Sequence, residues 1–454
     1  MTVTVLERFA GKRITVLGAG VSGVSLARFA RRKGARVFVT EQKVLSESTK
    51  ALFFREGISW EEGHSERACA CDELLLSSGV SPKAPLVERA LSLNIRVTGE
   101  ADAVAPFLRG RLVAVTGSNG KSTTVSLLGH LLRGVGRNVV VAGNIGLPLG
   151  DIADVEYDDV VMELSSFQLH WTKNIAVHLG IITNLDPDHL DWHGSFEKYI
   201  QAKFRLFDLL ADGGALIGQE REQVLYRTHE RMPTVPFAWE DSKKLEKVVF
   251  FEKESCFLRQ GDERIFLFDR RIVPIPGKHN AENAAMAMAA AVLLGGRPEC
   301  LREELKTFRS LPHRCEIVAT IDGVEYVDDS KGTNVAATVT ALASLEKPKI
   351  VILGGQGKGE SYDGLAEAVR NYAERAVVMG SERENICRAL DEAGYDKYER
   401  AADMETALMI SRSLARPGMM VLLSPACTSW DAYDNYKERG EHFRRIVQAF
   451  QART

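Results

Sequence analysis

An α/β protein of three domains is the fold that this 454-residue sequence predicts. Two glycine-rich turns, at residues 18–23 and 117–120, each follow a run of apolar or β-branched residues and precede a segment of helical spacing. The last third of the chain repeats a strand, a polar Gly/Ser turn and a helix. We therefore expect an N-terminal Rossmann-like domain over 1–108, a central P-loop ATPase-like domain with a small antiparallel sheet over 109–310, and a C-terminal Rossmann-like domain over 311–454.

The composition is that of a globular protein in water. Hydrophobic residues make up 45% and charged residues 26%, and the net charge of −3 provides no bulk attraction for nucleic acid or anionic membranes. No apolar run approaches the ~18 residues of a membrane span, and the N-terminus lacks a signal-peptide pattern. The seven cysteines are scattered and form no C-x-x-C pair. We expect a cytoplasmic monomer with reduced thiols, no nucleic-acid partner and no membrane span.

The first domain begins with a strand over 13–17, followed by G-A-G-V-S-G. Gly18, Gly20 and Gly23 have the G-x-G-x-x-G spacing that places a diphosphate at a helix N-terminus. A helix over 24–32 and a strand over 35–39 follow, and Glu41 then lies where an acidic group can bind a ribose hydroxyl. Further strands are expected over 73–76 and 95–97. An NAD-dependent oxidoreductase is the alternative, disfavoured because a second nucleotide loop follows.

That second loop lies in V-A-V-T-G-S-N-G-K-S-T-T, from Val113 to Thr124. Its turn can wrap backbone N–H groups around phosphates, and it consists of Gly117, Ser118, Asn119 and Gly120. Lys121 can reach terminal phosphate oxygens, and the hydroxyl of Ser122 or Thr123 can hold Mg²⁺. Val115 stands where the usual pattern has its first glycine, so this is a variant loop. The alternative is a simple strand-to-helix turn that contains G-K-S by chance.

Two more residues, Glu163 and His189, extend this ATP site, whereas Lys203 has no role on the basis of spacing alone. Glu163 ends a buried strand and is well placed to hold Mg²⁺. The loop N-L-D-P-D-H-L-D-W-H-G offers His189 as a functional residue and leaves Asp191 and His193 open. Lys203 lies beside the apolar stripe of a helix over 197–210, and spacing alone predicts that it extends to solvent.

The rest of the chain supplies polar groups for an adenine and for small anions. Residues 211–275 alternate in short segments typical of antiparallel strands, and Asn283 on the next helix can bind an adenine edge. In the third domain, four turns follow β runs and belong to the carboxyl edge of a sheet, where open parallel sheets bind ligands. Small anions are expected to bind to the side chains of Arg314, Asp329, Lys331 and Lys358. Cys427, in S-P-A-C-T-S, is interpreted as a small buried or loop residue in preference to a nucleophile.

One reaction uses all these parts. ATP phosphorylates a carboxylate on a nucleotide-linked substrate, and an amine held by the third domain attacks the acyl phosphate. The chain has no kinase-type H-R-D or D-F-G motif, and the small-anion binders of the third domain do not fit a motor or switch.

Several motifs carry a family resemblance. The T-G-S-N-G-K-S-T loop without its first glycine resembles that of the Mur ligases and the folylpolyglutamate synthetases, as do T-N-L-D-P-D-H-L-D-W-H, H-N-x-x-N and D-D-S-K-G-T-N. G-N-I-G-L-P, E-L-S-S-F-Q-L, L-P-H-R-C-E and S-P-A-C-T-S-W-D-x-Y-x-N-Y-K-E-R-G are similar to the D-glutamate-adding Mur ligases. The D-N-P-R motif expected of the meso-diaminopimelate-adding relatives is missing from the sequence.

The resemblance implies an ATP-dependent ligase that uses two Mg²⁺ ions to add D-glutamate to UDP-N-acetylmuramoyl-L-alanine during peptidoglycan precursor synthesis. The alternatives are another Mur ligase or a folylpolyglutamate synthetase-like ligase.

The resemblance also assigns site residues. The UDP-linked substrate would bind the glycine fingerprint together with Val21, Ser22, Glu41, Gln42, Lys43 and Gly79, and its acceptor end would contact Asn144, Ser165, Gln168 and His189. ATP would bind the loop through Lys121, Ser122 and Thr123, its adenine would bind Asn283, its ribose Asp329 and its phosphates Arg314. D-Glutamate would bind among Thr333, Lys358, Ser429 and Tyr436, with Lys331 nearby. The family usually has Asp-Thr-Arg at Glu41-Gln42-Lys43 and Phe at Tyr436.

The resemblance places the metal ions as well. Ser122 and Glu163 would hold one Mg²⁺, and His189 and Lys203 the other. Lys203, in A-K-F-R, matches a lysine that the family carbamylates, which turns a cation into an oxygen ligand. The sequence does not identify the base that deprotonates the amine, and His189 is one candidate.

Overall fold

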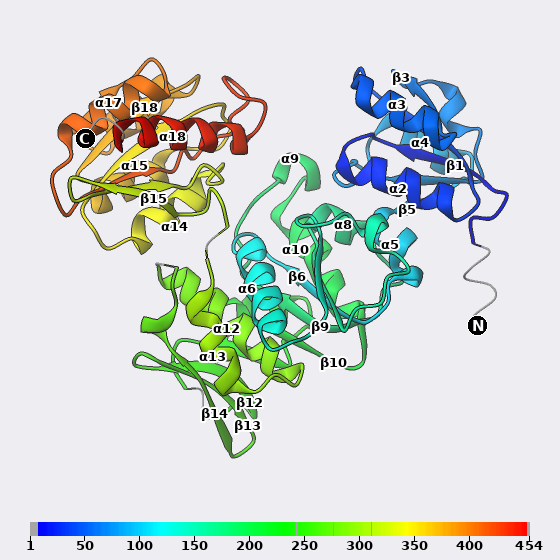
Figure 1. The fold of residues 1–454 in the computed structure, drawn as a ribbon, viewed down its shortest axis with the longest axis horizontal. Helices are drawn as coiled ribbons and strands as arrows, with labels where there is room; N and C mark the ends of the chain where they lie inside the picture. The colour runs from blue at the N-terminus through cyan, green and yellow to red at the C-terminus, as the bar shows by residue number, and fades with distance from the viewer. Residues whose placement is uncertain (1–7, 242–243, 276, 310, 452–454) are drawn as a thin grey trace. The chain divides into compact units, whose positions relative to one another are not determined.

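The structure is a computed structural model that describes residues 8–241, 244–275, 277–309 and 311–451. The chain divides into two compact units (Figure 1). The first runs to Arg270 and includes Asn283–Leu305, and the second comprises Arg271–Glu282 and the chain from Lys306 onward. Both units are α/β, so the predicted fold class is confirmed. The boundary expected at residue 108 stays a prediction.

The first sheet has five parallel strands in the order β3-β2-β1-β4-β5. Its strands are β1 Arg13–Leu17, β2 Arg36–Glu41, β3 Ser59–Glu62, β4 Glu73–Leu76 and β5 Arg96–Gly99. Its helices are α2 Val21–Arg32, α3 Glu47–Glu56, α4 Pro85–Ser92 and α5 Glu100–Val104, with 3₁₀ turns η1 Glu66–Cys69 and η2 Ala105–Phe107. Successive residues of a strand point to opposite faces of the sheet and belong to two apolar clusters. Val16 therefore packs with α2, while Leu17 packs with α4. The sequence reading missed β3, because S-W-E-E at a sheet edge carries no apolar run.

The second sheet has nine strands in the order β14-β13-β12-β11-β10-β9-β6-β8-β7. These strands are β6 Arg111–Thr116, β7 Val139–Gly143, β8 Asp159–Glu163, β9 Val177–Ile182, β10 Leu210–Gln219, β11 Val235–Ala238, β12 Lys247–Glu252, β13 Ser255–Gln260 and β14 Glu263–Asp269. The predicted antiparallel strands are present as β12, β13 and β14. They do not form a separate sheet, because β10, β11 and β12 first continue the parallel pairing of the core.

The helices of this region follow or cover its strands. They are α6 Lys121–Gly134, α7 Leu149–Ile152, α8 Ser166–His170, α9 Leu190–His193, α10 Phe196–Asp208, α11 Gln223–Thr228, α12 Lys278–Leu293 and α13 Pro298–Thr307, with η3 Glu220–Glu222 and η4 Arg270–Ile272.

The third sheet belongs to the second unit and has the order β15-β16-β20-β17-β18-β19. Its strands are β15 Glu316–Ile321, β16 Val324–Asp328, β17 Lys349–Gly354, β18 Arg375–Met379, β19 Tyr398–Arg400 and β20 Met420–Leu423, and all neighbours are parallel except β15 and β16. Its helices are α14 Val335–Ser344, α15 Asp363–Tyr372, α16 Arg383–Glu392, α17 Met404–Leu414 and α18 Tyr436–Gln451. Alternation along the strands puts α14, α15 and α16 against one face, and α17 and α18 against the other. The two unforeseen strands, β15 and β19, are the edge strands.

None of the helices among the described residues combines the length and hydrophobicity needed to cross a membrane. All seven cysteines are free thiols, as their spacing predicted.

Candidate active site

The P-loop lies at the carboxyl ends of three adjacent strands. β6 ends at Thr116 between β8 and β9, and its Val115 pairs with Glu163 on one side and Ile181 on the other. Gly117 and Gly120 have φ of +141° and +79°. A Cβ on Gly117 would lie 1.9 Å from Thr183 Oγ1, and one on Gly120 would lie 2.4 Å from Asn283 Oδ1. Both positions therefore require glycine.

The loop is held by the segment that follows β9. Thr183 Oγ1 donates to Asn119 O (2.5 Å), Asn119 N donates to Asn184 Oδ1 (2.8 Å), and Asp186 N donates to Ser118 Oγ (2.8 Å). These bonds fix the cradle from outside, so its shape depends on residues more than sixty positions away. Sequence reasoning assigned no role to Thr183 or Asn184.

Two lysines converge on this loop. Lys121 Nζ donates to the carbonyls of Gly117 and Ser118, at 2.8 Å each. Lys203 Nζ, from α10, donates to the same Gly117 carbonyl at 2.7 Å. The solvent exposure expected from the spacing of Lys203 was wrong, since the residue is 1% exposed. It turns inward because the phosphate loop supplies a carbonyl that its ammonium can reach.

Tyr199 completes the environment of Lys203 one helical turn earlier. The Lys203 ammonium lies 4.4 Å from the centre of the Tyr199 ring, and the Tyr199 hydroxyl donates to Ser118 Oγ (2.9 Å). Burial lowers the pKa of Lys203 well below its ordinary value, the nearby Lys121 charge lowers it further, and Asp188 and Glu163 oppose the shift. A buried lysine with a depressed pKa is a nucleophilic amine. The sequence analysis did not link Tyr199 to Lys203, although their i, i+4 spacing on α10 was a signal that could have done so.

Glu163 ends β8 beside the loop and is 1% exposed. Its Oε1 accepts from Asn144 Nδ2 at 2.7 Å, while the buried Oε2 has no hydrogen-bond partner among the described residues. A buried, unpartnered carboxylate oxygen costs free energy unless a ligand satisfies it. Asn144 thus lies close to the P-loop, where it holds the carboxylate.

These groups fit ATP and Mg²⁺. The loop offers glycine-shaped backbone and a lysine, α6 begins at Lys121 and directs its N-terminal end to the same place, and Glu163 Oε2 supplies the hard oxygen that Mg²⁺ requires. Ser122 is buried at the helix start, and Asn283 contacts the next turn, accepting from Thr124 Oγ1 at 3.3 Å.

His189 lies immediately before α9, with φ of +52°. Its ring packs against Phe167 at 4.7 Å between centroids, and its Nε2 lies 3.4 Å from Asp188 Oδ2. Asp188, which the sequence reading did not single out, therefore orients His189. His193, left open by the sequence, is buried and bonds Ser166 Oγ through Nε2 (3.0 Å), which indicates a structural role. The side chain of Asp191 lies outside what the structure describes.

Ser165 and Gln168 form a capping box at the start of α8. Gln168 Oε1 accepts from the Ser165 backbone and hydroxyl, at 3.0 Å each. Gln168 Nε2 is buried and has no hydrogen-bond partner among the described residues. This amide N–H is therefore available to an acceptor that lies close to it inside the protein.

The glycine fingerprint forms as predicted between β1 and α2. A Cβ on Gly23 would lie 2.0 Å from Gly18 O, so the third glycine allows close packing of helix and strand. Ser22 Oγ accepts from Ser78 N at 3.1 Å, beside Gly79, and Val21 is 80% exposed at the helix start. Glu41 Oε2 accepts from Ala19 N at 2.7 Å, so in this structure the carboxylate closes the glycine loop. Gln42 and Lys43 are exposed next to it.

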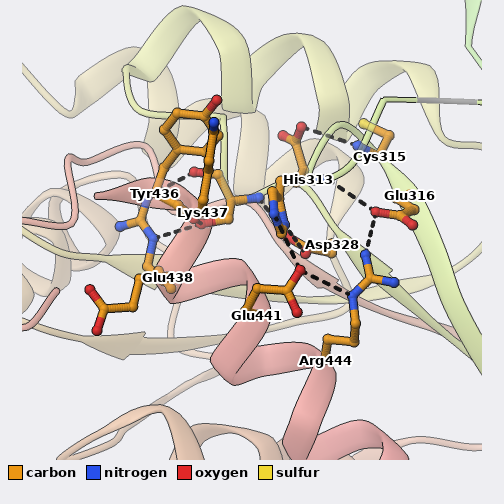
Figure 2. A network of polar contacts seen from close by, with 12 residues as sticks. His313, Cys315, Glu316, Asp328, Tyr436, Lys437, Glu438, Glu441 and Arg444 are labelled. Atoms are coloured by element: carbon orange, nitrogen blue, oxygen red, sulfur yellow. Dashed lines mark hydrogen bonds and ion pairs between the residues drawn. The ribbon is translucent and has the colours of Figure 1, made fainter. Parts of the chain in front are cut away.

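In the second unit, a polar network surrounds His313 (Figure 2). His313 Nδ1 donates to Asp328 Oδ2 (2.7 Å), and Glu316 Oε2 accepts from His313 N (3.1 Å) and from Arg444 (2.7 Å). His313, Glu316 and Asp328 have the geometry of a small metal site, but hydrogen bonds within the network already occupy atoms that a metal ion would need. We interpret the network as structural, because it fixes the turn that carries Arg314 and Cys315.

Behind this turn lies Asp329, which is buried. Its oxygens accept from Ser424 Oγ (2.7 Å) and Cys315 N (3.3 Å), and burial raises its pKa to about 7 despite the opposing Arg314 charge. Arg314 and Asp329, predicted together as ATP ligands, therefore lie close to one another.

The residues predicted to bind D-glutamate come from loops that follow three strands of the third sheet, at the carboxyl ends of those strands. The loops after β17 and β20 pair through Gln356 and Thr428, which brings the exposed Lys358 loop beside Ser429. The Lys331 ammonium lies 3.9 Å from the centre of the Tyr436 ring, and Thr333 N donates to Lys331 O.

Arg439, which the sequence reading missed, ties these loops together. Its buried guanidinium donates to Ser330 Oγ and O, Thr428 O and Cys427 O at 2.9–3.1 Å. The K-E-R-G run was its only sequence signal. Burial raises the pKa of the Cys427 thiol to about 11, so that cysteine is an inert packing residue as expected.

Comparison with known proteins decides the family. Residues 13–86 match the family model "MurD N-terminal domain", 115–291 the "Mur ligase middle domain" and 313–427 the "Mur ligase, glutamate ligase domain". UDP-N-acetylmuramoylalanine–D-glutamate ligase of Salinibacter ruber is 36% identical over 96% of this chain and 97% of its own length, and that of Acidobacterium capsulatum is 35% identical over 97% and 96%. The chain belongs to the Mur ligase family, among its D-glutamate ligases.

Solved Mur ligase structures share the fold of this Mur ligase. UDP-N-acetylmuramate-alanine ligase of Thermotoga maritima has a TM-score of 0.62 at 17% identity and covers 98% of this chain and 100% of its own. MurF ligase of the same organism, solved with ADP, has a TM-score of 0.60 at 18% identity and covers 99% and 100%.

Proposed function

We propose that this Mur ligase uses ATP to join D-glutamate to UDP-N-acetylmuramoyl-L-alanine, below called the UDP-linked substrate, in peptidoglycan precursor synthesis. The observation that carries the proposal is full-length similarity to the D-glutamate ligases, at up to 36% identity among the relatives compared. The buried ATP site of the first unit supports it chemically.

In the first step, a carboxylate oxygen of the L-alanyl group attacks the γ-phosphorus of ATP, which forms an acyl phosphate and releases ADP. Gly117, Ser118, Asn119 and Gly120 would surround the phosphates with backbone N–H groups, and Lys121 would leave its loop carbonyls to bind them. The adenine would bind Asn283. Bound Mg²⁺ ions, two in our proposal, would neutralise charge that develops on the phosphate oxygens.

The metal ligands in the proposal are Ser122, Glu163, His189 and Lys203. The unpartnered Glu163 Oε2 supports its assignment, and Thr123 would bind phosphate from the same helix start. Lys203 can be a ligand only after its amine adds CO₂ and loses a proton to give an N-carboxylate. Burial favours the neutral amine that this addition requires.

In the second step, the D-glutamate amine attacks the acyl carbon, and inorganic phosphate leaves as the amide forms. Thr333, Lys358, Ser429 and Tyr436 would hold D-glutamate, with the Lys331 ammonium as a further cation. Arg314 would bind phosphate and Asp329 the ribose. His189, beside Asp188, is our candidate for the group that takes the amine proton.

The UDP-linked substrate would bind along the first unit. Its UDP end would contact the glycine fingerprint, Val21, Ser22 and Gly79, with Glu41, Gln42 and Lys43 around it. The acceptor end would contact Asn144, Ser165 and Gln168, and the capping box that fixes Ser165 and Gln168 at the start of α8 supports that placement. We further propose that the enzyme works as a monomer in the cytoplasm, where ATP and nucleotide-linked sugars are available.

The test is phosphate release from ATP with a panel of amino acids. Release should require both the UDP-linked substrate and D-glutamate, with L-glutamate, L-lysine and meso-diaminopimelate inactive. Release with L-glutamate and a folate would select a folylpolyglutamate synthetase-like enzyme, and release with another amino acid would select another Mur ligase. NADH binding without ATP binding would select an oxidoreductase and refute the proposal.

A further inference from the structure

A buried carboxyl in the first unit has no part in the proposed mechanism. Glu100 begins α5 and is 3% exposed. Its Oε2 accepts from Ser78 Oγ at 3.0 Å, whereas its buried Oε1 has no hydrogen-bond partner among the described residues. A buried acceptor without a partner costs free energy, so a group that can donate to it is expected close by.

A second unpartnered polar atom lies close to it. Gln168 Nε2 is buried and unbonded within the described part of the chain, and the Gln168 amide is near enough to lower the pKa of Glu100. Because Ser165 holds Gln168 Oε1 with two donors, the amide nitrogen faces the carboxyl side. The reverse orientation would bring two oxygen acceptors together, so Glu100 and Ser165 favour the same orientation of the Gln168 amide.

Glu100 also contacts a residue beside the proposed UDP-binding residues. Ser78, whose hydroxyl donates to Glu100, donates its backbone N–H to Ser22 Oγ at 3.1 Å. A single row of polar groups therefore runs from Ser22 at the glycine fingerprint, through Ser78 and Glu100, to Gln168 on α8.

We infer that Glu100 is a positioning residue for the UDP-linked substrate, whose carboxyl orients Ser78 on the UDP side and the Gln168 amide on the acceptor side. The inference rests on the proposed function, because Ser22 and Gln168 are its substrate contacts. Glu100 itself touches neither reacting atom.

The ionisation of this carboxyl gives the inference a second readout. Burial raises the pKa of Glu100 to about 7, and the charge of Asp151 on α7 adds to the rise, while Ser78, Gln168 and the Leu149 backbone oppose it. Asp151 in turn accepts from Ser25 Oγ at 2.8 Å. Above pH 7 the carboxylate is the stronger acceptor for both donors, so the substrate should bind more tightly at pH 8 than at pH 6.

The test compares Glu100→Gln with Asp102→Asn in the full-length enzyme. Asp102 is buried on the same helix, but its carboxylate accepts from Lys173 N, Asn174 N and Asn174 Nδ2 and contacts no proposed substrate residue. We expect Glu100→Gln to raise the KM for the UDP-linked substrate about tenfold, with kcat and the KM for ATP and D-glutamate within about twofold. Asp102→Asn should leave the KM for the UDP-linked substrate unchanged.

Two further measurements separate positioning from folding. Calorimetric titration with the UDP-linked substrate should show an affinity that rises with pH for the wild type and is flat for Glu100→Gln. Ser78→Ala should raise the same KM, and its effect should not add to that of Glu100→Gln, because both act through one hydrogen bond. A wild-type KM in Glu100→Gln, or a uniform fall in all kinetic constants together with thermal stability, would overturn the inference. An inactive wild type would instead refute the proposed function.

Discussion

Glu163→Gln is the perturbation that separates a metal ligand from a structural carboxylate. The substitution keeps the size of the side chain. It also keeps an oxygen that can accept from Asn144 Nδ2, which lies 2.7 Å from Glu163 Oε1 in the wild type. It replaces the buried Oε2, which has no hydrogen-bond partner among the described residues, with a neutral amide nitrogen that cannot bind a cation.

The two roles predict opposite effects on stability. Loss of one unit charge near a cation costs on the order of 4 kcal/mol at a separation of about 4 Å and an effective dielectric of about 20. If this free energy is lost in the transition state, kcat should fall about 10³-fold. The ligand-free protein, in contrast, no longer has to bury a carboxylate oxygen that lacks a hydrogen-bond donor, so its free energy of unfolding should rise by about 1 kcal/mol.

The assay is phosphate release at saturating substrates across a Mg²⁺ titration, combined with thermal unfolding of the ligand-free protein. Asp159→Asn is the matched control at the other end of the same strand, where Asp159 pairs with Arg111 (2.9 Å) and Arg137 (2.6 Å). The Asp159→Asn variant should lose about 1–2 kcal/mol of folding stability, because solvent screens the two Asp159–arginine ion pairs only in part. Its kcat per folded molecule should stay within about twofold of wild type.

Activity and stability that fall together in Glu163→Gln would refute the reasoning, because a structural carboxylate would then explain both losses. A kcat within tenfold of wild type at every Mg²⁺ concentration would do the same.

Four other predictions follow. Lys203→Ala should lose activity and regain part of it with short carboxylic acids, and the absence of rescue at any concentration would argue against carbamylation. Gly23→Ala should raise the KM for the UDP-linked substrate, because its Cβ would lie 2.0 Å from Gly18 O; an unchanged KM in calorimetry or kinetics would contradict this packing. Lys358→Ala should raise the KM for D-glutamate while the KM for ATP stays constant in the same phosphate assay, and equal changes in both would remove Lys358 from the amino-acid site. Asp329 has a folded-state pKa raised to about 7, so the folded protein binds the extra proton and the wild type should lose stability as pH rises from about 4 to 7; unfolding experiments should show a smaller loss in Asp329→Asn.

Much of the fold follows from local patterns in the chain. Each glycine-rich turn between a β run and a helix became a loop at a strand end, because only glycine tolerates the backbone angles of Gly18 and Gly120. The missed strands β3, β15 and β19 lie at sheet edges, whereas β10 and β11, which were not predicted as parallel strands, lie inside the second sheet. An edge strand buries less apolar surface, so its sequence carries a weaker signal. The antiparallel strands were expected, but their union with the parallel sheet depends on pairing between distant segments.

By itself the sequence determined the classes of chemistry, since P-loop glycines, Lys121 and Glu163 have types and spacings that few other functions require. The tertiary structure decided which groups meet. Lys203 follows Lys121 by 82 positions, and the two ammonium groups share the Gly117 carbonyl only because β6 and α10 pack together. Glu100 and Gln168 carried no sequence signal for each other, and their proximity arises where α5 approaches α8. Spacing along a chain encodes local geometry, whereas long-range contacts depend on the packing of the whole unit, and a single sequence does not record them.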